Sequence, residues 1–498
     1  MANSSKGTAS LAHKPSLGTF LGSYSISLSK QMTFARLSGD LNPIHADPIA
    51  ARRTLSGGIT VHGIHHVLLA LEALLKYLLK TTGCRSTLVG ITAQFLKPVL
   101  VEDSIDIYLT ERKSETSQLI CVVCEEQVVT ITFRFGLAPV RKQKLSIPSL
   151  VKEPIIAATF DELKNAAGQI SVGLDSSLAK KLFPRATKLL GTVRVAHLLA
   201  LTRLIGMRCP GLHSMSGQYD VSWISCDGSG PLKYRVVKSD DRFRRLHIEV
   251  SSGQLNGTLS AFVLPAPEQQ LNTAAIKTRV PAGSFSSSCA LIVGGSRGLG
   301  EITAKIIAAG GGHPIITYHQ GAKDAESVVK DIRDSGGNCS LLKLNVAAEV
   351  SMALQSLLRG HHVPRSIYYF ATPKIFSPRC AFFDSRKLST FEDIYVTSFV
   401  RLVTAVSSVT TGRLRVFYPS SIAVEEQKRD LAEYVIAKQA AESVCAFYNH
   451  YSDRIKIIVA RLPWTKTDQT SALLPLTTEE PLDVMLSFVQ RVESLTEK

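Results

Sequence analysis

Asp40 and His45 are the first residues in the chain whose types and spacing suggest chemistry. They stand five positions apart in Phe34-Ala-Arg-Leu-Ser-Gly-Asp40-Leu-Asn-Pro-Ile-His45. Pro43 disfavours helix at Asn42 and makes the bend rigid, so we expect a turn that lets both side chains converge on one small site. One group can take a proton from water while the other supplies a proton to a carbon, since histidine titrates near neutral pH. The pair therefore suits reversible addition of water to a double bond.

A glycine-rich stretch, Gly57-Gly-Ile-Thr-Val-His62-Gly63, leads into an amphipathic helix that we predict from His62 to Leu79. Addition of water beside an acyl carbonyl develops an enolate oxygen, which needs hydrogen-bond donors. Backbone amides at a helix N-terminus are ready donors to an anion. The N–H of Gly63 is therefore our candidate for the oxyanion hole.

A second candidate site begins with Ala290-Leu-Ile-Val-Gly294-Gly-Ser-Arg-Gly298-Leu-Gly300, which follows a predicted strand and leads into a predicted helix from Glu301 to Ala309. Glycines here allow a tight turn and let a pyrophosphate approach the helix N-terminus closely. A glycine-rich turn alone is a weak signal, and its position at the first strand–helix junction of its segment strengthens it.

Tyr434 and Lys438 stand one helical turn apart on one face of a predicted helix. A nearby cation lowers the pKa of a phenol, so Tyr434 can donate a proton to a carbonyl that receives a hydride. Ser421 stands thirteen positions before Tyr434, after the predicted strand Leu414 to Tyr418, where its hydroxyl can hold the substrate oxygen. An isolated Y-x3-K is usually a solvated helix face, whereas its combination with the glycine turn and Ser421 favours an oxidoreductase site.

Two linker-like stretches, Pro139 to Glu153 and Pro265 to Ser288, divide the chain. We expect domains at residues 1–140, 155–268 and 288–498, with a linker at 269–287. The sequence pattern of the first domain predicts a central helix followed by antiparallel strands, which is an α+β arrangement. The second domain repeats this pattern more loosely. The third alternates strands and helices, which predicts an α/β domain with a parallel, doubly wound sheet. The expected strands of the first domain are Thr87 to Leu96, Ser104 to Thr110, Leu119 to Cys124 and Glu126 to Phe135.

Composition narrows the class of protein without choosing a ligand. The 57 Lys and Arg residues against 41 Asp and Glu give a net charge of +16, which attracts polyanions such as nucleic acid, coenzyme phosphates or an acidic carrier protein. Without a zinc finger or a basic block with interleaved aromatics, nucleic acid is not expected. No apolar stretch suits a signal peptide or a membrane span, and nine scattered cysteines argue against a disulfide scaffold, so we expect a cytoplasmic protein. Cys121 and Cys124 form a C-x-x-C that we interpret as two core thiols.

The whole string around Asp40 resembles the signature of the R-specific enoyl-thioester hydratases (MaoC-like, hydratase 2), as do Val61-His62-Gly63 and Gln94-Phe-Leu-Lys-Pro98. The resemblance covers roughly residues 20 to 137. It implies a hotdog fold, Asp40 and His45 as the catalytic pair, and syn hydration or dehydration in the 3R-hydroxyacyl series. Members work as hotdog pairs, so residues 155–268, which lack the motif, are expected to be a non-catalytic second hotdog.

Residues 288 to 470 resemble the short-chain dehydrogenase/reductase family, nearest to 3-ketoacyl-thioester reductases. By that resemblance Tyr434 is the proton donor, Lys438 binds the nicotinamide ribose, and Ser421 orients the carbonyl. The acidic residue usual after the second strand is missing from Thr317-Tyr-His-Gln320, and Arg297 lies in the glycine loop, which favours NADPH. The resemblance also implies a homo-oligomer formed through this domain. The expected cofactor-binding residues are Gly294, Ser296, Arg297, Gly298, Leu299, Gly300, Asn345, Tyr434, Lys438, Pro463 and Thr467.

Several positions depart from the reductase pattern. Thr397 stands where the family has its active-site Asn, and Trp464 follows Pro463 in place of Gly. Other departures are Val293, Asn345-Val346 and Tyr369-Phe-Ala-Thr372. Cofactor binding remains expected, and the rate of turnover is put in question.

The leading hypothesis is a bifunctional enzyme. It reduces a 3-ketoacyl thioester with NADPH and dehydrates the (3R)-hydroxyacyl thioester to the trans-2-enoyl thioester, on acyl carrier protein or coenzyme A, in fatty-acid or polyketide-like biosynthesis. Two alternatives stay open: a degradative hydratase and 3-hydroxyacyl-CoA dehydrogenase, and a hydratase whose reductase domain is a weakly active scaffold. No metal site is expected.

Overall fold

The computed structural model describes residues 17–81, 87–136, 147–224, 230–348, 350, 363–376, 383–470 and 476–495. The predicted linker between the first two domains lies partly outside these residues. The chain forms two compact units, the first made mainly of residues up to Phe262 and the second mainly of residues from Val263 onward. Each unit is built around its own sheet.

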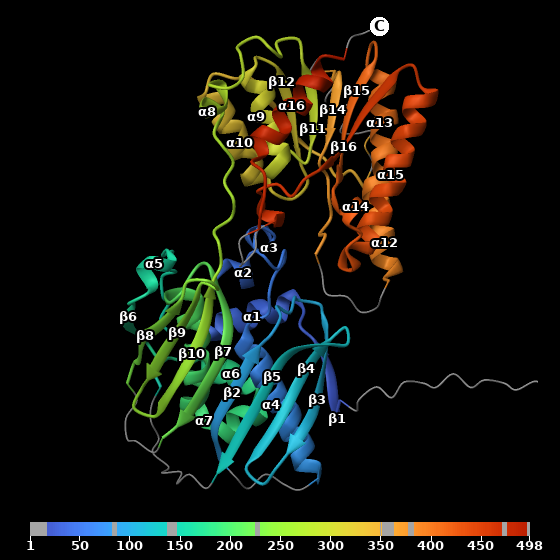
Figure 1. Ribbon diagram of the computed structural model, residues 1–498. Coiled ribbons are helices and arrows are strands. Elements are labelled where there is room, and N and C mark those ends of the chain that lie inside the picture. Colours follow the sequence, from blue (N-terminus) through green and yellow to red (C-terminus); the bar gives the residue numbers. More distant parts are fainter. Residues whose placement is uncertain are drawn as a thin grey trace, which may run out of the picture. The chain divides into compact units, whose positions relative to one another are not determined.

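The first unit has a ten-stranded sheet with the order β1-β3-β4-β5-β2-β7-β10-β9-β8-β6 (Figure 1). The second five strands, read inward from the β6 edge, repeat the order of the first five read inward from the β1 edge, and β2 joins β7 in antiparallel register. The strands are β1 (Thr19–Ser25), β2 (Thr87–Phe95), β3 (Ser104–Arg112), β4 (Thr116–Val123), β5 (Glu126–Gly136), β6 (Ala167–Ile170), β7 (Ser214–Trp223), β8 (Leu232–Asp240), β9 (Arg245–Ser251) and β10 (Leu255–Val263). The four strands expected after the first long helix are confirmed with shifts at their ends.

Two long helices, α4 (Gly63–Thr81) and α7 (Pro184–Arg203), pack against each other beside this sheet. Apolar residues recur along α4 at helical spacing and are buried, which explains why the amphipathic pattern forms a core helix. The stretch Pro184–Arg208, which includes the π-helix η1 (Leu204–Arg208), is long and apolar enough to cross a membrane, and 72% of its apolar 18-residue window is buried inside the protein. The shorter helices that precede β7 in the sequence are α1 (Leu28–Ser38), α2 (Pro43–Ala46), α3 (Pro48–Ala51), α5 (Phe160–Leu163) and α6 (Ser176–Leu182).

The second unit has a six-stranded sheet with the order β13-β12-β11-β14-β15-β16, and each described pair of neighbours is parallel. The strand order reverses between β11 and β14, and in open α/β sheets ligands bind outside the carboxyl ends of the strands at such a point. The strands are β11 (Cys289–Val293), β12 (His313–Tyr318), β13 (Ser340–Lys343), β14 (Ser366–Tyr369), β15 (Leu414–Ser421) and β16 (Ile455–Leu462).

Helices cover both faces of the parallel sheet (Figure 1). On one face, α9 (Gly298–Ala309), α10 (Ala322–Asp334) and α16 (Pro481–Glu493) share a buried apolar cluster with the strands. On the other face, α12 (Ser385–Glu392), α13 (Ser398–Val409) and α15 (Ala432–Tyr451) share a second cluster. The remaining elements are α8 (Thr273–Lys277), α14 (Ala423–Glu426), the π-helix η2 (Asp393–Thr397) and the 3₁₀ turns η3 (Arg429–Leu431) and η4 (Asp468–Thr470).

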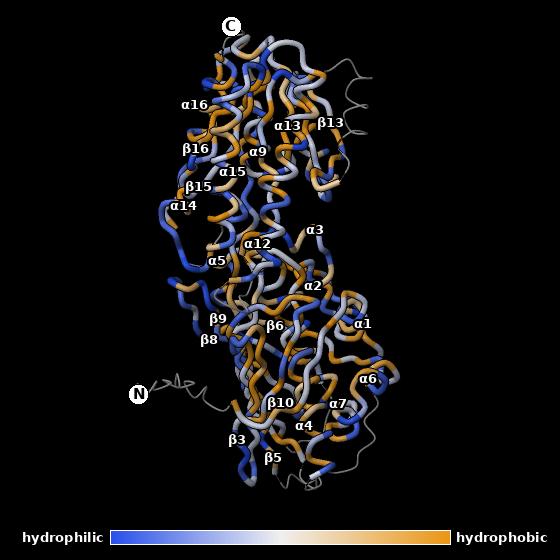
Figure 2. Tube along the Cα trace, turned by 90° about the vertical axis from the view of Figure 1, so that its right-hand side faces the viewer, coloured by the Kyte–Doolittle hydropathy of each residue, from blue (hydrophilic) through white to orange (hydrophobic). Residues whose placement is uncertain are grey.

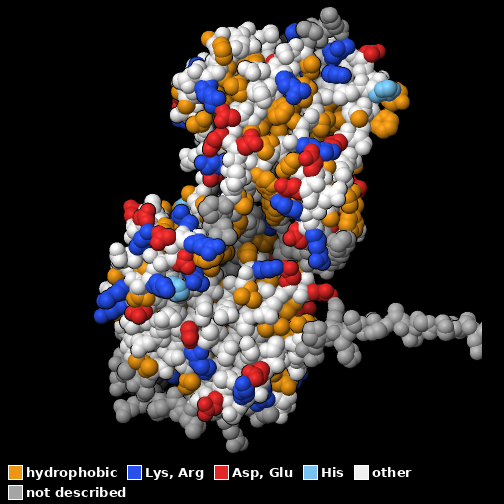
Figure 3. Space-filling model, viewed as in Figure 1, with side chains coloured by type: hydrophobic (Ala, Val, Ile, Leu, Met, Phe, Trp, Pro, Cys, Tyr) orange, Lys and Arg blue, Asp and Glu red, His pale blue; other side chains and the backbone are white. Residues whose placement is uncertain are grey.

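Hydropathy and charge follow this layering. Apolar residues run along the strands and core-facing helices of each unit in Figure 2. Lys and Arg side chains are interspersed with Asp and Glu on the face seen in Figure 3, so the net charge of +16 is not gathered there into one basic patch. Cys121 is a buried free thiol as expected. Cys124 is disulfide-bonded, so the interpretation of the C-x-x-C as two core thiols is wrong for this residue.

Candidate functional site

Asp40 lies directly beyond the C-terminal end of α1 and is almost completely buried, with 1% of its side chain exposed. Ser27 caps the N-terminus of α1 through its side chain, and Gly39 ends the helix in the left-handed conformation with φ 71°. This local geometry turns the chain inward, so the carboxylate enters the interior of the first unit.

His45 lies on α2, a helix of a single turn that begins at Pro43. The bend expected at Asn42-Pro43 is thus a short helix, because proline suits the first helical position, where its missing N–H costs nothing. His45 Nδ1 lies 2.6 Å from the carbonyl oxygen of Thr60. A carbonyl only accepts, so Nδ1 carries the proton and Nε2 is the basic nitrogen of the neutral ring.

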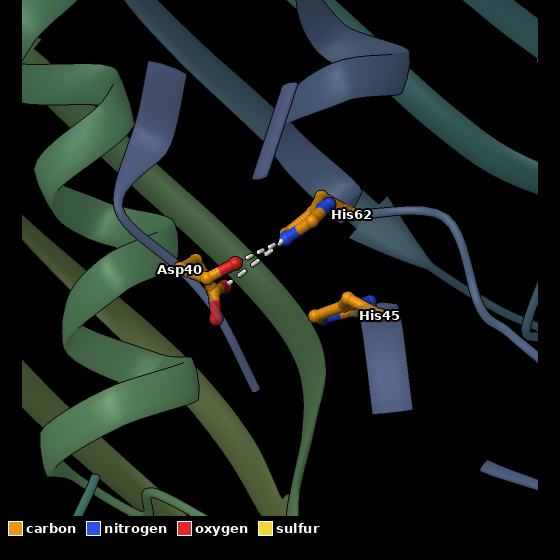
Figure 4. Close-up of side chains that lie close together, drawn as sticks. All are labelled: Asp40, His45 and His62. Carbon is orange, nitrogen blue, oxygen red and sulfur yellow. Dashed lines mark hydrogen bonds and ion pairs between the residues drawn. The ribbon is translucent and has the colours of Figure 1, made fainter. Parts of the chain in front are cut away.

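Asp40, His45 and His62 gather in one cluster (Figure 4). One carboxylate oxygen of Asp40 and one ring nitrogen of each histidine all lie within 4.8 Å of one another. The sequence-predicted pair is therefore brought together, and His62, predicted only as part of the helix start, joins it. The burial of Asp40 and His62 makes this a mostly dry site, in which a proton transfer is little disturbed by bulk water.

His62 is held on both sides of its ring. Its Nε2 lies 3.0 Å from the backbone oxygen of Asp40 and 3.7 Å from the Asp40 carboxylate, and its Nδ1 lies 2.9 Å from Gln31 Nε2. The matching neutral tautomer donates from Nε2 to Asp40 and accepts at Nδ1 from Gln31. His62 thus supports Asp40 rather than acting as a base, and a metal ion bound there would have to displace one of these hydrogen bonds.

The second half of the unit also contacts Asp40. Thr202, on α7, donates from Oγ1 to Asp40 Oδ2 at 2.9 Å. A side chain at Gly206 would collide with the Asp40 carboxylate, so glycine is required for this close approach. Asn42 donates from Nδ2 to the backbone oxygens of Gly206 and Gly211, at 2.8 and 3.0 Å. Residues without any catalytic motif therefore fix the carboxylate that the motif supplies.

Gly63 is the first residue of α4. Its N–H belongs to the first turn, where amides have no partner within the helix, which agrees with the role expected for an oxyanion donor. A Cβ at this position would lie 2.7 Å from the ring of Phe95, so glycine lets β2 approach the start of the helix.

The glycine turn joins β11 to α9 as predicted. Gly298 has φ 57° and begins α9, and a side chain at Gly300 would collide with the carbonyl of Gly294. The turn therefore leaves a cradle that any side chain would fill, and it fits a dinucleotide phosphate at a helix N-terminus. Arg297 immediately precedes α9, and its guanidinium lies 3.5 Å from the carboxylate of Asp468. Burial lowers the pKa of Arg297.

Ser421, Tyr434 and Lys438 come together beyond the carboxyl end of β15. Ser421 ends β15 and lies close to the hydroxyl of Tyr434. Burial raises the pKa of Tyr434 to about 12, and the interaction with the Ser421 side chain acts in the opposite direction. Lys438 donates from Nζ to the carbonyl oxygen of Pro419 at 2.7 Å, and burial lowers its pKa to about 7. The predicted phenol, ammonium and hydroxyl thus share one site.

The other predicted cofactor-binding residues lie on neighbouring loops. Thr467 stands beside Gly298, since a Cβ on Gly298 would lie 3.6 Å from its methyl group. Asn345 follows β13 and accepts from the N–H of Ala347 at 3.1 Å, a local turn contact. Pro463 follows β16, and its carbonyl accepts from Thr465. Ser296 and Leu299 belong to the glycine turn and the first turn of α9.

Two departures from the reductase pattern have structural consequences. Trp464 donates from Nε1 to Glu426 at 3.3 Å and lies under the ammonium of Lys428, 4.6 Å from its ring centroid. Thr397, which stands at the position of the family Asn, is exposed, whereas Tyr395 of the same π-helix is buried beside Lys438. Sequence reasoning missed Tyr395, Thr202 and His62, and only His62 had a signal, its place beside Gly63.

Comparisons with known proteins find similarity in parts of the chain. Residues 19–131 match the model of the MaoC like domain. No curated protein matches the sequence. An angucycline C-6 ketoreductase, LanV, solved with bound NADP, is 20% identical and has a TM-score of 0.38, covering 42% of this chain and 91% of its own. A 3-oxoacyl (acyl-carrier-protein) reductase from Agrobacterium tumefaciens with NADP bound is 17% identical with a TM-score of 0.37, covering 42% and 88%.

A dehydrogenase/reductase from Sinorhizobium meliloti is 18% identical with a TM-score of 0.39, covering 44% of this chain and 91% of its own. The second unit is characterised by its parallel strand order and by Ser421, Tyr434 and Lys438 at one site. For the first unit, the family match spans both Asp40 and His45. The residues that supply the buried carboxylate and the half-buried imidazole therefore lie within the segment that matches the MaoC like domain.

Proposed function

We propose that the chain is bifunctional, with a 3-ketoacyl-thioester reductase that uses NADPH and a dehydratase that converts the (3R)-hydroxyacyl thioester to the trans-2-enoyl thioester. In this proposal the first unit is a double hotdog and the second a Rossmann-type reductase. One observation carries it: the chain brings together two sets of acid–base side chains, Asp40 with His45 and Ser421 with Tyr434 and Lys438. Their reactions are consecutive on one β-oxygenated acyl thioester.

In the dehydratase, Asp40 and His45 divide two proton transfers. One takes the proton from the α-carbon, and the other, which is protonated when the step begins, gives its proton to the departing β-hydroxyl, so that water leaves and the double bond forms. The proton taken from the α-carbon restores the number of protons on the pair. Charge that develops on the thioester oxygen is accepted by the N–H of Gly63. Because Nδ1 of His45 is bound to Thr60, its Nε2 faces the reaction. Hydration is the same sequence in reverse.

In the reductase, bound NADPH supplies the hydride. Tyr434 gives its phenolic proton to the oxygen of the ketone, and the hydroxyl of Ser421 orients that oxygen beside the phenol. Lys438 places a positive charge beside Tyr434, 5.8 Å from its ring centroid, which favours loss of the phenolic proton. Arg297, at the start of α9, is the residue that favours a 2′-phosphate, since no carboxylate follows β12 at Thr317 to Gln320.

The acyl group is carried by acyl carrier protein or coenzyme A, and we place the reaction in fatty-acid or polyketide-like biosynthesis. The NADPH preference and the net charge of +16 support this direction, because a basic surface steers an acidic carrier. The proposal also includes a cytoplasmic location, domains at residues 1–140, 155–268 and 288–498, and self-association through the reductase domain.

A second candidate is a hydratase whose reductase domain binds nucleotide and turns over slowly. Lys438 favours it, because its ammonium is bound to the carbonyl of Pro419 and buried. To bind a nicotinamide ribose, the ammonium must share or exchange this hydrogen bond. An exposed Thr397 in place of Asn favours the same reading.

Two assays on the purified chain decide between these functions. With acetoacetyl thioester, the bifunctional enzyme oxidises NADPH, and with crotonyl thioester it adds water. Intact hydration without NADPH oxidation would select the second candidate. Absence of both reactions would overturn the proposal.

A further inference from the structure

Tyr395 occupies an unusual position in the second unit. It lies in the π-helix η2, between α12 and α13, and only 1% of it is exposed. A π-helical turn holds more residues than an α-helical turn and shifts the side chains that follow, and such turns are frequent at functional sites. Here the turn directs Tyr395 inward and leaves Thr397 exposed.

The ring of Tyr395 lies against two members of the reductase set, Lys438 and Tyr434. Lys438 Nζ is 4.1 Å from its centroid, and the rings of Tyr395 and Tyr434 are 5.7 Å apart in an edge-to-face arrangement. Tyr418 adds a second face, with its centroid 4.8 Å from Lys438 Nζ. An ammonium within about 6 Å of an aromatic centroid is attracted by the ring, most strongly where water is excluded.

The two tyrosines are themselves fixed. The hydroxyl of Tyr395 is 2.6 Å from Thr372 Oγ1, and Tyr418 donates to the backbone oxygen of Tyr395 at 3.2 Å. Phe391 stacks on Tyr395 with parallel rings whose centroids are 5.7 Å apart. The aromatic faces are therefore rigid partners for the ammonium and need no rearrangement to contact it.

We propose that Tyr395, assisted by Tyr418, is the positioning residue that holds the ammonium of Lys438 beside Tyr434. Lys438 affects the reaction through its charge beside Tyr434, and Tyr395 affects it by holding Lys438 in place. The inference deepens the proposed reductase function and rests on it for its meaning in turnover. The contact between Tyr395 and Lys438 can be tested without turnover.

The groups around Lys438 determine how a substitution at Tyr395 will change the pKa of Lys438. From β15 the ammonium meets Tyr418 and the carbonyl of Pro419, and from α15 it meets Tyr434, Glu442 and Cys445. Glu442 is bound to Arg461 at 2.7 Å and to Ser420, so it is engaged elsewhere. Burial disfavours the charged lysine, and the aromatic faces oppose that effect.

The test is lysine-selective NMR of the full-length protein, labelled at the lysine Cε, in which the signal of Lys438 is identified by its loss in Lys438→Met. A methylene beside a ring face is shifted by the ring current. Tyr395→Phe keeps the ring and should keep this shift. Tyr395→Leu removes the ring and should lose it, together with a fall of the Lys438 midpoint on the order of one pH unit.

Phe417→Leu is the matched control, because Phe417 is equally buried but packs in the apolar cluster on the other face of the sheet. It should leave the shift and the midpoint of Lys438 unchanged. Tyr395→Met, which removes the ring with less loss of volume, serves if Tyr395→Leu does not fold. The proposal is overturned if Tyr395→Leu or Tyr395→Met retains the wild-type shift and midpoint, or if Tyr395→Phe loses them.

NADPH oxidation, measured on the same variants, separates this inference from the proposed function. Reduction by Tyr395→Leu should fall by about fivefold at pH 7, as its charged fraction of Lys438 falls, with a smaller change in the KM for NADPH. If the wild-type chain oxidises no NADPH while the NMR signals respond as expected, the proposed reductase activity fails and the positioning of Lys438 stands.

Discussion

Replacing Thr202 with valine should slow hydration without affecting reduction. Thr202 Oγ1 donates to Asp40 Oδ2 at 2.9 Å, and both side chains are almost fully buried. Valine has nearly the same shape and removes only the hydroxyl. A hydrogen bond to a charged group contributes roughly 1.5–3 kcal/mol. If the transition state loses the stabilisation from this hydrogen bond, kcat/KM for hydration falls by about 10-fold to 100-fold.

The assay is hydration of crotonyl thioester, with NADPH oxidation by the same preparation as an internal reference. Thr187→Val is the matched control, since Thr187 is a buried threonine of the same helix whose hydroxyl is bound to the carbonyl of Ala179 at 3.3 Å. Equal hydration by Thr202→Val and Thr187→Val would refute the reasoning that the second half of the unit holds the Asp40 carboxylate.

Three further predictions concern both sites. Asp40→Ala should abolish hydration of crotonyl thioester and spare NADPH oxidation, whereas Tyr434→Phe should do the reverse; loss of both activities in either variant would contradict separate sites. Arg297→Ala should raise the KM for NADPH by about tenfold or more and change that for NADH little, because a charge-assisted hydrogen bond to phosphate is lost. Burial lowers the pKa of Lys438 from 10.5 to about 7, so between these values the unfolded chain binds one proton more and folded-state stability rises with pH. The free energy of unfolding of the wild type, measured with urea, should therefore rise by up to about 1.4 kcal/mol per pH unit relative to that of Lys438→Met in this range. The same dependence on pH in both proteins would contradict this prediction.

The features that the sequence predicts well are local ones. Gly298 and Gly300 are required by a turn between adjacent elements, and Tyr434 and Lys438 are set by the spacing of a single helix. Long helices such as α4 follow from apolar periodicity. Each of these needs only neighbouring residues, so composition and spacing carry the information.

Contacts that depend on distant parts of the chain were beyond sequence reasoning. Thr202 is 162 positions from Asp40, and its hydroxyl gives no sign of a carboxylate partner. Tyr395 takes the inward position because the chain forms a π-turn at Asp393–Thr397, which shifts the inward position away from Thr397. The sequence predicts a turn at Pro43, whereas the structure has the start of α2 there. Proline is compatible with both a turn and the first position of a helix, so its presence does not distinguish them.

The most direct test of the bifunctional account follows one acyl chain through both reactions. A 3-ketoacyl thioester is incubated with NADPH and the thioester products are identified by mass. Wild type should form the enoyl thioester, Asp40→Ala should stop at the hydroxyacyl thioester, and Tyr434→Phe should leave the ketone unchanged. Enoyl product from Asp40→Ala, or unchanged ketone with the wild-type chain, would contradict the account.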